Sequence, residues 1–204
     1  CISKWFAINI NYEHQDLISL PIGLSNEYSP KNIFKDDYKE LPEVTFEEKK
    51  DSLYVNFQMN TNFISRHKLE KKFKKYAWVH HEYPKLQIKQ YLNHLKSYKF
   101  IFAPQGNGID THRVWETIYA GSIPVVEEHT NFKFFKDLPI IFYKDNKELT
   151  LDYLQRKEKE IKIESFSSRK LSISYWLEIM NKDLIPSNSE KVTFIESEQH
   201  SKHY

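Results

Sequence analysis

Residues 100–126 read FIFAPQGNGIDTHRVWETIYAGSIPVV, and this stretch decides the fold. Its first four residues, 100–103, form a continuous apolar run, which is typical of a strand buried on both faces of a parallel sheet. A glycine turn follows, then a helical pattern over 111–120 and a second apolar strand over 123–126. A strand, a crossover helix and a second strand form one unit of a parallel α/β sheet.

The same alternation continues on both sides of this stretch. It predicts an α/β fold, a doubly wound Rossmann-like lobe with a mostly parallel sheet. We expect Pro84 in the first turn of a helix, where proline is well tolerated. Further strands are expected over 52–57, 77–80 and 139–143, and further helices over 64–75, 84–96, 131–137, 147–162 and 166–181.

The first fifty residues have a different pattern. Two strand-like runs, 5–10 and 17–24, leave little room for a helix between them, and an acidic, proline-punctuated segment follows. The sequence predicts three parts. They are the end of a preceding lobe with a linker over 1–45, the Rossmann-like lobe over 46–186, and a polar tail over 187–204.

The composition excludes several classes of protein. The 204 residues are 40% hydrophobic and carry a net charge of +2, so the chain has material for a core and no basic excess for nucleic acid. The single cysteine, Cys1, excludes an internal disulfide framework. The sequence contains no signal-peptide pattern and no apolar run near the ~20 residues of a membrane span, so we expect a cytoplasmic protein. The start at Cys1 instead of Met is compatible with a piece of a longer chain.

Glycine is scarce, and its placement marks a candidate site. Only four glycines occur, and Gly106, Gly108 and Gly121 fall within sixteen positions. Gly106 and Gly108 permit a tight turn and close approach of a ligand, whereas Gly121 is expected to end the following helix. Asp110 or Thr111 is expected to cap that helix. The free amides at its first turn favour an anion.

Helical spacing predicts that His112, Arg113 and Glu116 share one face of this helix. The planar guanidinium of Arg113 suits a diphosphate, and a carboxylate one turn later suits ribose hydroxyls. The alternative is a purely structural glycine turn, with Arg113 and Glu116 forming an ordinary helix-face pair worth ~0.2–0.5 kcal/mol. Neither the GxGxxG fingerprint nor the P-loop pattern is present.

The stretch PQGNGIDTHRVWETIYAGSIPVV, residues 104–126, resembles the exostosin-like glycosyltransferases related to family 47. The resemblance extends over about residues 4–150 and is specific in 100–126. It implies a GT-B enzyme whose C-terminal lobe binds a nucleotide sugar, usually a UDP-sugar, and transfers the sugar to a glycan or glycolipid. The alternatives are a non-catalytic nucleotide- or glycan-binding module and an interaction domain that only keeps the fold.

The resemblance also implies roles for single residues. Arg113 would contact the diphosphate and Glu116 the ribose. The loop amides would lie beside the phosphates, and residues after the first strand of the lobe would form the other wall of the cleft. These further donor-binding candidates are Gly106, Asn107, Gly108, Asn60, Thr61, Asn62 and Arg66.

An inverting transfer requires a general base near the acceptor hydroxyl. Asp110 and His112 are the visible candidates, and the base can also lie in sequence upstream of Cys1. The resemblance implies metal-independent chemistry with no cofactor besides the nucleotide sugar. It also implies a position at the inner membrane surface, where glycans are assembled.

Two histidine patterns raise the question of a metal. One is His80-His81-Glu82, and the other is His112 with Glu116 at i,i+4 spacing. Neither has a third ligand at helical spacing, so the sequence predicts no metal site.

Overall fold

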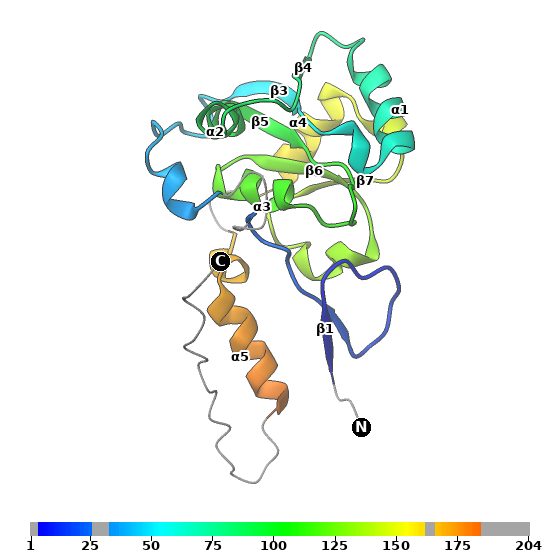
Figure 1. Ribbon diagram of the computed structural model, residues 1–204, viewed down its shortest axis with the longest axis vertical. Helices are drawn as coiled ribbons and strands as arrows, with labels where there is room; N and C mark the ends of the chain where they lie inside the picture. Colours follow the sequence, from blue (N-terminus) through cyan, green and yellow to red (C-terminus); the bar gives the residue numbers. More distant parts are fainter. Residues whose placement is uncertain (1–3, 26–32, 162–165, 185–204) are drawn as a thin grey trace, which may run out of the picture.

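The fold is described from a computed structural model over residues 4–25, 33–161 and 166–184. Its centre is a five-stranded sheet in the order β4-β3-β5-β6-β7, and every neighbouring pair is parallel (Figure 1). The predicted α/β class with a parallel, Rossmann-like sheet is therefore confirmed. The strands are β3 (Lys50–Val55), β4 (Val79–His81), β5 (Tyr98–Phe102), β6 (Ile123–Glu127) and β7 (Ile141–Tyr143).

Helices cover both faces of this sheet, because alternate strand residues point to opposite sides. On β3, Leu53 and Val55 join the core under α1 and α4, whereas Tyr54 joins the core under α2. Residues of α3 pack in a third cluster, together with Val126 of β6. The helices are α1 (Phe63–Phe73), α2 (Ile88–Ser97), α3 (His112–Tyr119) and α4 (Leu151–Glu160).

The N-terminal segment forms a sheet of its own. Strands β1 (Trp5–Ala7) and β2 (Leu17–Ser19) pair in parallel. The side chain of the fully buried Asn131 accepts hydrogen bonds from the Ile10 amide and the Ser19 hydroxyl, at 2.9 Å each. This contact fixes the small sheet against the 3-10 helix Thr130–Phe135.

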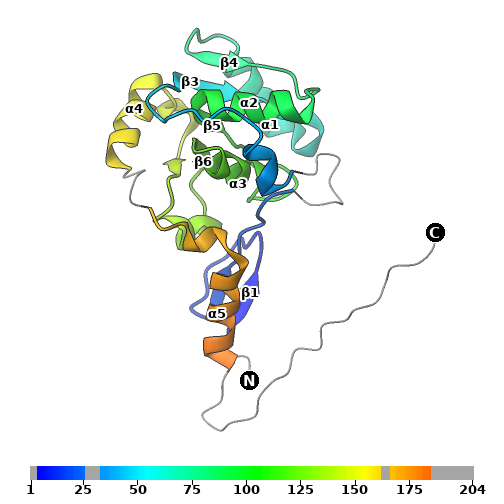
Figure 2. The same ribbon diagram turned by 90° about the vertical axis from the view of Figure 1, so that its left-hand side faces the viewer.

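The C-terminal helix α5 (Ile173–Leu184) extends from the same end of the lobe as the small sheet (Figure 2). Trp176 of α5 is buried in the third cluster, where it packs edge-on against Phe135. The boundary near residue 45 stays a prediction, and the predicted tail over 187–204 lies outside the described residues.

Four predicted helices differ from the structure in their bounds or type. The helix after Pro84 begins only at Ile88, because Gln87 is still extended at φ −63°, ψ 148°. The segment 131–137 forms a 3-10 helix, Thr130–Phe135, in which His129 accepts a bond from the Asn131 amide. The long helices predicted over 147–162 and 166–181 each begin as a separate 3-10 turn, Asn146–Glu148 and Ser168–Leu171.

Other local predictions are confirmed. Thr111 is the N-cap residue of α3, and Gly121 follows its C-cap at φ +67°, a backbone conformation that favours glycine. Among the described helices, none combines the length and the apolar character that a membrane span requires.

Candidate functional site

A cleft of about 540 Å³ opens at the carboxyl ends of β3 and β5, where open α/β sheets bind ligands. The segment after β3 forms one wall, and the loop between β5 and α3 forms the other. Ile22 and Ser25 reach the cleft from the N-terminal segment, and Pro84 and Tyr91 reach it from the β4–α2 side. The cleft is therefore assembled from four separate parts of the chain.

The glycine turn, residues 106–108, lies close to the side chains of Arg66 and Asn9. A Cβ atom at Gly106 would lie 2.8 Å from Nη2 of Arg66, and a Cβ atom at Gly108 would lie 2.6 Å from Oδ1 of Asn9. The Asn9 side chain also accepts a 2.7 Å bond from the Asp110 amide. Only glycine permits these approaches, so the two glycines give the loop its position in the cleft.

Within the loop, the Gly106 amide donates to the Gly108 carbonyl at 2.9 Å. This amide is therefore engaged within the loop in this conformation. Gly106, Asn107 and Gly108 all line the cleft, and their place beside the phosphates stays a prediction.

Arg66 holds the loop in place. Its guanidinium donates to the carbonyl oxygens of Gln58 at 2.6 Å, Gln105 at 2.9 Å and Pro104 at 3.1 Å. These bonds tie the segment after β3 to the loop after β5. Burial, with a further contribution from the nearby Arg113 cation, lowers the pKa of Arg66 to about 10. Arg66 lines the cleft, and its donors position the backbone around it.

Arg113 has spare hydrogen-bonding capacity. Its Nη2 lies 3.5 Å from Oδ1 of Asn56, and its guanidinium lies over the Tyr91 ring, 5.2 Å from the centroid. Its Nη1 is buried and has no hydrogen-bond partner. A buried donor without an acceptor is rare in folded proteins and marks a place for a ligand or an ordered water.

Glu116 lies one turn further along α3 and is only 6% exposed. The Tyr91 hydroxyl donates to Glu116 Oε2 at 2.5 Å. No ion pair joins the side chains of Arg113 and Glu116, both of which the structure describes. The alternative of an ordinary helix-face pair therefore has no support, because each group is oriented by different neighbours.

Asp110 and His112 both reach back to the N-terminal segment. The Asp110 carboxylate is 2% exposed and accepts bonds from the Ile22 amide at 2.9 Å and from Trp115 Nε1 at 3.0 Å. Burial raises the pKa of Asp110 to about 6. His112 bonds through Nδ1 to the Gly23 carbonyl at 2.9 Å. Both residues line the cleft, and their catalytic roles stay predictions.

The predicted Asn60-Thr61-Asn62 wall is placed only in part. Thr61 lines the cleft, whereas Asn60 and Asn62 are not among its lining residues. Asn62 is instead the N-cap residue of α1, and its carbonyl accepts a bond from the Arg66 amide. In the 3-10 helix Met59–Thr61, consecutive side chains point in different directions because one turn contains three residues. Thr61 can therefore face the cleft while its neighbour Asn60 does not.

Sequence reasoning missed Asn9, Asn56 and Tyr91. Asn56 follows β3 directly, so its place at the carboxyl end of a strand was a usable signal. Tyr91 falls in the apolar stripe of α2, where it resembles an ordinary core residue. Asn9 has a positive φ of 55° and lies 101 residues before its partner Asp110.

The model of the RXYLT1 C-terminal domain family matches residues 58–188, more than half of the chain. The chain belongs to this family. The family is related to the glycosyltransferases, which agrees with the resemblance at that coarser level. No curated protein sequence matches the chain.

The family match includes most of the cleft. It contains the Arg66 guanidinium, the glycine loop and the whole of α3. Asn9 and Asn56, which contact the loop and Arg113, precede the matched region.

Proposed function

We propose that this chain is a glycosyltransferase whose cleft binds a nucleotide-sugar donor, with UDP-sugar as the preferred class. The acceptor in this proposal is a hydroxyl group of a glycan or glycolipid. The observation that carries the proposal is the buried, unpartnered Nη1 of Arg113 at the wall of the cleft.

The charges around the cleft support an anionic ligand. Arg66 and Arg113 lie close enough for the second cation to lower the pKa of the first. An anion between two guanidinium groups relieves this repulsion, and a diphosphate offers several oxygens to the planar fork of Arg113. The positive end of α3 adds to the same field.

Glu116 supports recognition of the ribose. Its carboxylate lines the cleft one helical turn beyond Arg113 and is held by the Tyr91 hydroxyl. The carboxylate has a second oxygen, which can accept from a ribose hydroxyl. The cleft volume of about 540 Å³ falls in the usual range for small-molecule sites.

The proposed transfer is inverting. The acceptor oxygen attacks the anomeric carbon, the bond from that carbon to the diphosphate oxygen breaks, and a base takes the acceptor proton. Arg113 stabilises the charge that develops on the departing diphosphate. Of the two visible base candidates, His112 keeps Nε2 available for this step, whereas the Asp110 carboxylate is engaged by Ile22 and Trp115.

The proposal assigns the sheet and its helices to the donor lobe of a GT-B-type enzyme. The separate β1–β2 sheet supports an assignment of this part of residues 1–45 to the end of a second lobe. Ile33, Tyr38 and Leu41 belong instead to the core of the donor lobe, where they are buried with residues of α2.

The test has two steps. Calorimetry with UDP, GDP, ADP and CDP measures donor recognition, and the proposal predicts saturable binding with UDP preferred. Release of UDP from a panel of UDP-sugars, with and without glycan acceptors, then measures catalysis. UDP-xylose comes first in this panel because the matching family is xylosyltransferase-like. Binding without acceptor-dependent turnover would instead support the non-catalytic module, and no binding would contradict a donor site.

A further inference from the structure

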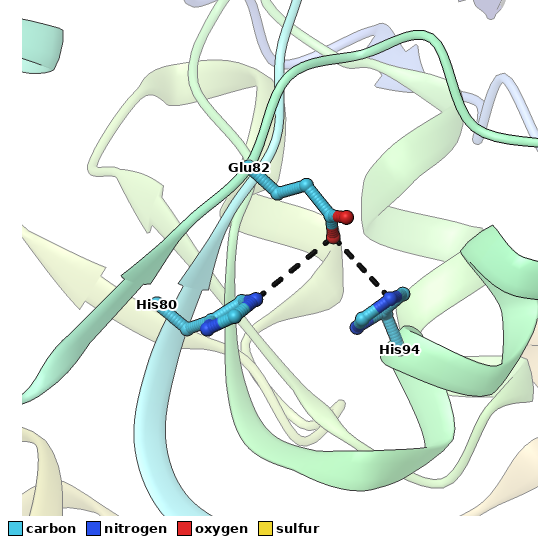
Figure 3. Close-up of side chains that lie close together, drawn as sticks. All are labelled: His80, Glu82 and His94. Atoms are coloured by element: carbon cyan, nitrogen blue, oxygen red, sulfur yellow. Dashed lines mark ion pairs between the residues drawn. The ribbon is translucent and has the colours of Figure 1, made fainter.

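Three potential metal ligands meet outside the cleft, at the edge strand of the sheet. His80 lies on β4, Glu82 follows this strand directly, and His94 lies on α2 (Figure 3). Residues two apart on a strand point to the same side, so His80 and Glu82 face α2 together. His94 supplies the third ligand that no spacing in the sequence reveals, since it comes from a separate element.

The two imidazoles converge on one carboxylate oxygen. Nε2 of His94 lies 3.3 Å from Oε2 of Glu82, and Nε2 of His80 lies 3.9 Å from the same atom. Figure 3 shows the carboxylate reaching between the two rings. One ligand atom from each residue lies within 4.8 Å of the others.

These separations are close to those of a metal site. With bonds of about 2.0–2.1 Å in a tetrahedral arrangement, ligand atoms lie about 3.4 Å apart. A distance of 3.9 Å exceeds a hydrogen bond, so no shared proton holds His80 against Glu82. The His80 side chain is 45% exposed, which gives it freedom to close the remaining gap.

The surroundings hold the ligands in orientation. The hydroxyl of the fully buried Tyr54 donates to Glu82 Oε2 at 3.2 Å. The Tyr54 ring also stacks on His94, with centroids 5.2 Å apart and an angle of 5° between the planes. In metal sites, the ligating carboxylates and imidazoles are usually held in orientation by such neighbouring groups.

We propose that His80, Glu82 and His94 bind a divalent transition metal of the zinc class. Two imidazoles and one carboxylate suit zinc, whereas magnesium prefers oxygen ligands alone. Three protein ligands leave a fourth position for water, on the solvent side of His80. The bound metal would fasten β4 to α2 and brace the connection that carries Pro84 into the cleft wall.

Metal titration of the full chain, freed of metal with a chelator, tests this proposal. We expect Zn²⁺ to bind with one-to-one stoichiometry and to raise the melting temperature, and Mg²⁺ to do neither. Co²⁺ should give the visible absorption of a four-coordinate nitrogen and oxygen site. His80→Ala and Glu82→Gln should each weaken Zn²⁺ binding at least tenfold.

The control is His81→Ala. His81 neighbours the site on the same strand but points to the opposite side, 3.8 Å from Glu70. The His81→Ala variant should keep wild-type affinity for Zn²⁺. A second control, His200→Ala/His203→Ala, tests the histidines near the C-terminus. The proposal would be overturned if His81→Ala lost as much Zn²⁺ affinity as the ligand variants, or if only the C-terminal variant lost affinity. It would also be overturned if the folded wild type did not bind Zn²⁺.

Discussion

Replacing Arg113 with alanine tests the proposed site at its centre. Arg113 has one long bond to Asn56 and a ring contact with Tyr91, and its Nη1 has no partner. Two hydrogen bonds to a charged ligand contribute about 3 kcal/mol or more together, and each 1.4 kcal/mol is tenfold in affinity. We therefore expect the dissociation constant for UDP to rise about 100-fold.

The stability of this variant should change little. The lost ring contact contributes about 0.5–1 kcal/mol, and removal of an unpartnered buried donor offsets part of that loss. The melting temperature should thus shift by no more than about 4 °C. Arg113→Lys keeps the charge without the planar fork, so its affinity for UDP should lie between those of the wild type and Arg113→Ala.

Calorimetry with UDP and a thermal melt provide the assay, and Arg156→Ala is the matched control. Arg156 lies on α4 with a side chain 62% exposed, and it pairs with Glu160. This control should bind UDP as the wild type does. Unchanged UDP affinity in Arg113→Ala, or equal losses in both variants, would refute the assignment of Arg113.

Three further predictions concern the residues around Arg113. Gly106→Ala places a Cβ atom 2.8 Å from Nη2 of Arg66, whose guanidinium is held by bonds to three carbonyls, so urea unfolding should show a loss of about 1–3 kcal/mol. Tyr91→Phe removes the donor to the buried Glu116 carboxylate and should cost about 1–3 kcal/mol in the same assay, with weaker UDP binding. Burial raises the pKa of Asp110 from 3.8 to about 6, so the folded state binds this proton more tightly than the unfolded state does. The stability of the wild type relative to Asp110→Asn should therefore fall as the pH rises from about 4 to 6, by up to about 3 kcal/mol, and a flat difference across this range would contradict the buried carboxylate.

The sheet could be predicted because its strands are continuous apolar runs. Residues 100–103 and 123–126 are buried on both sides, and a continuous apolar run is typical of such a strand in a parallel sheet. Helix boundaries were less predictable. Pro84 suits a first helical turn, yet residues 84–87 stay outside α2, and Pro84 lies in the cleft wall.

The candidate site was predictable where its geometry is local. The spacing of Arg113 and Glu116 places them on one face of α3 in any regular helix. Asn9 and His94 could not be found this way, because their contacts with Asp110 and Glu82 depend on how separate elements pack. No periodicity in the sequence encodes such pairs.

The most direct test of the central claim is an NMR titration of the ¹⁵N-labelled chain with UDP. We predict saturable shifts in the amide signals of Asn107, Gly108 and Arg113, which line the cleft, with no change at the distant Arg156. Shifts confined to other surfaces, or none at millimolar UDP, would contradict a nucleotide-sugar site in this cleft.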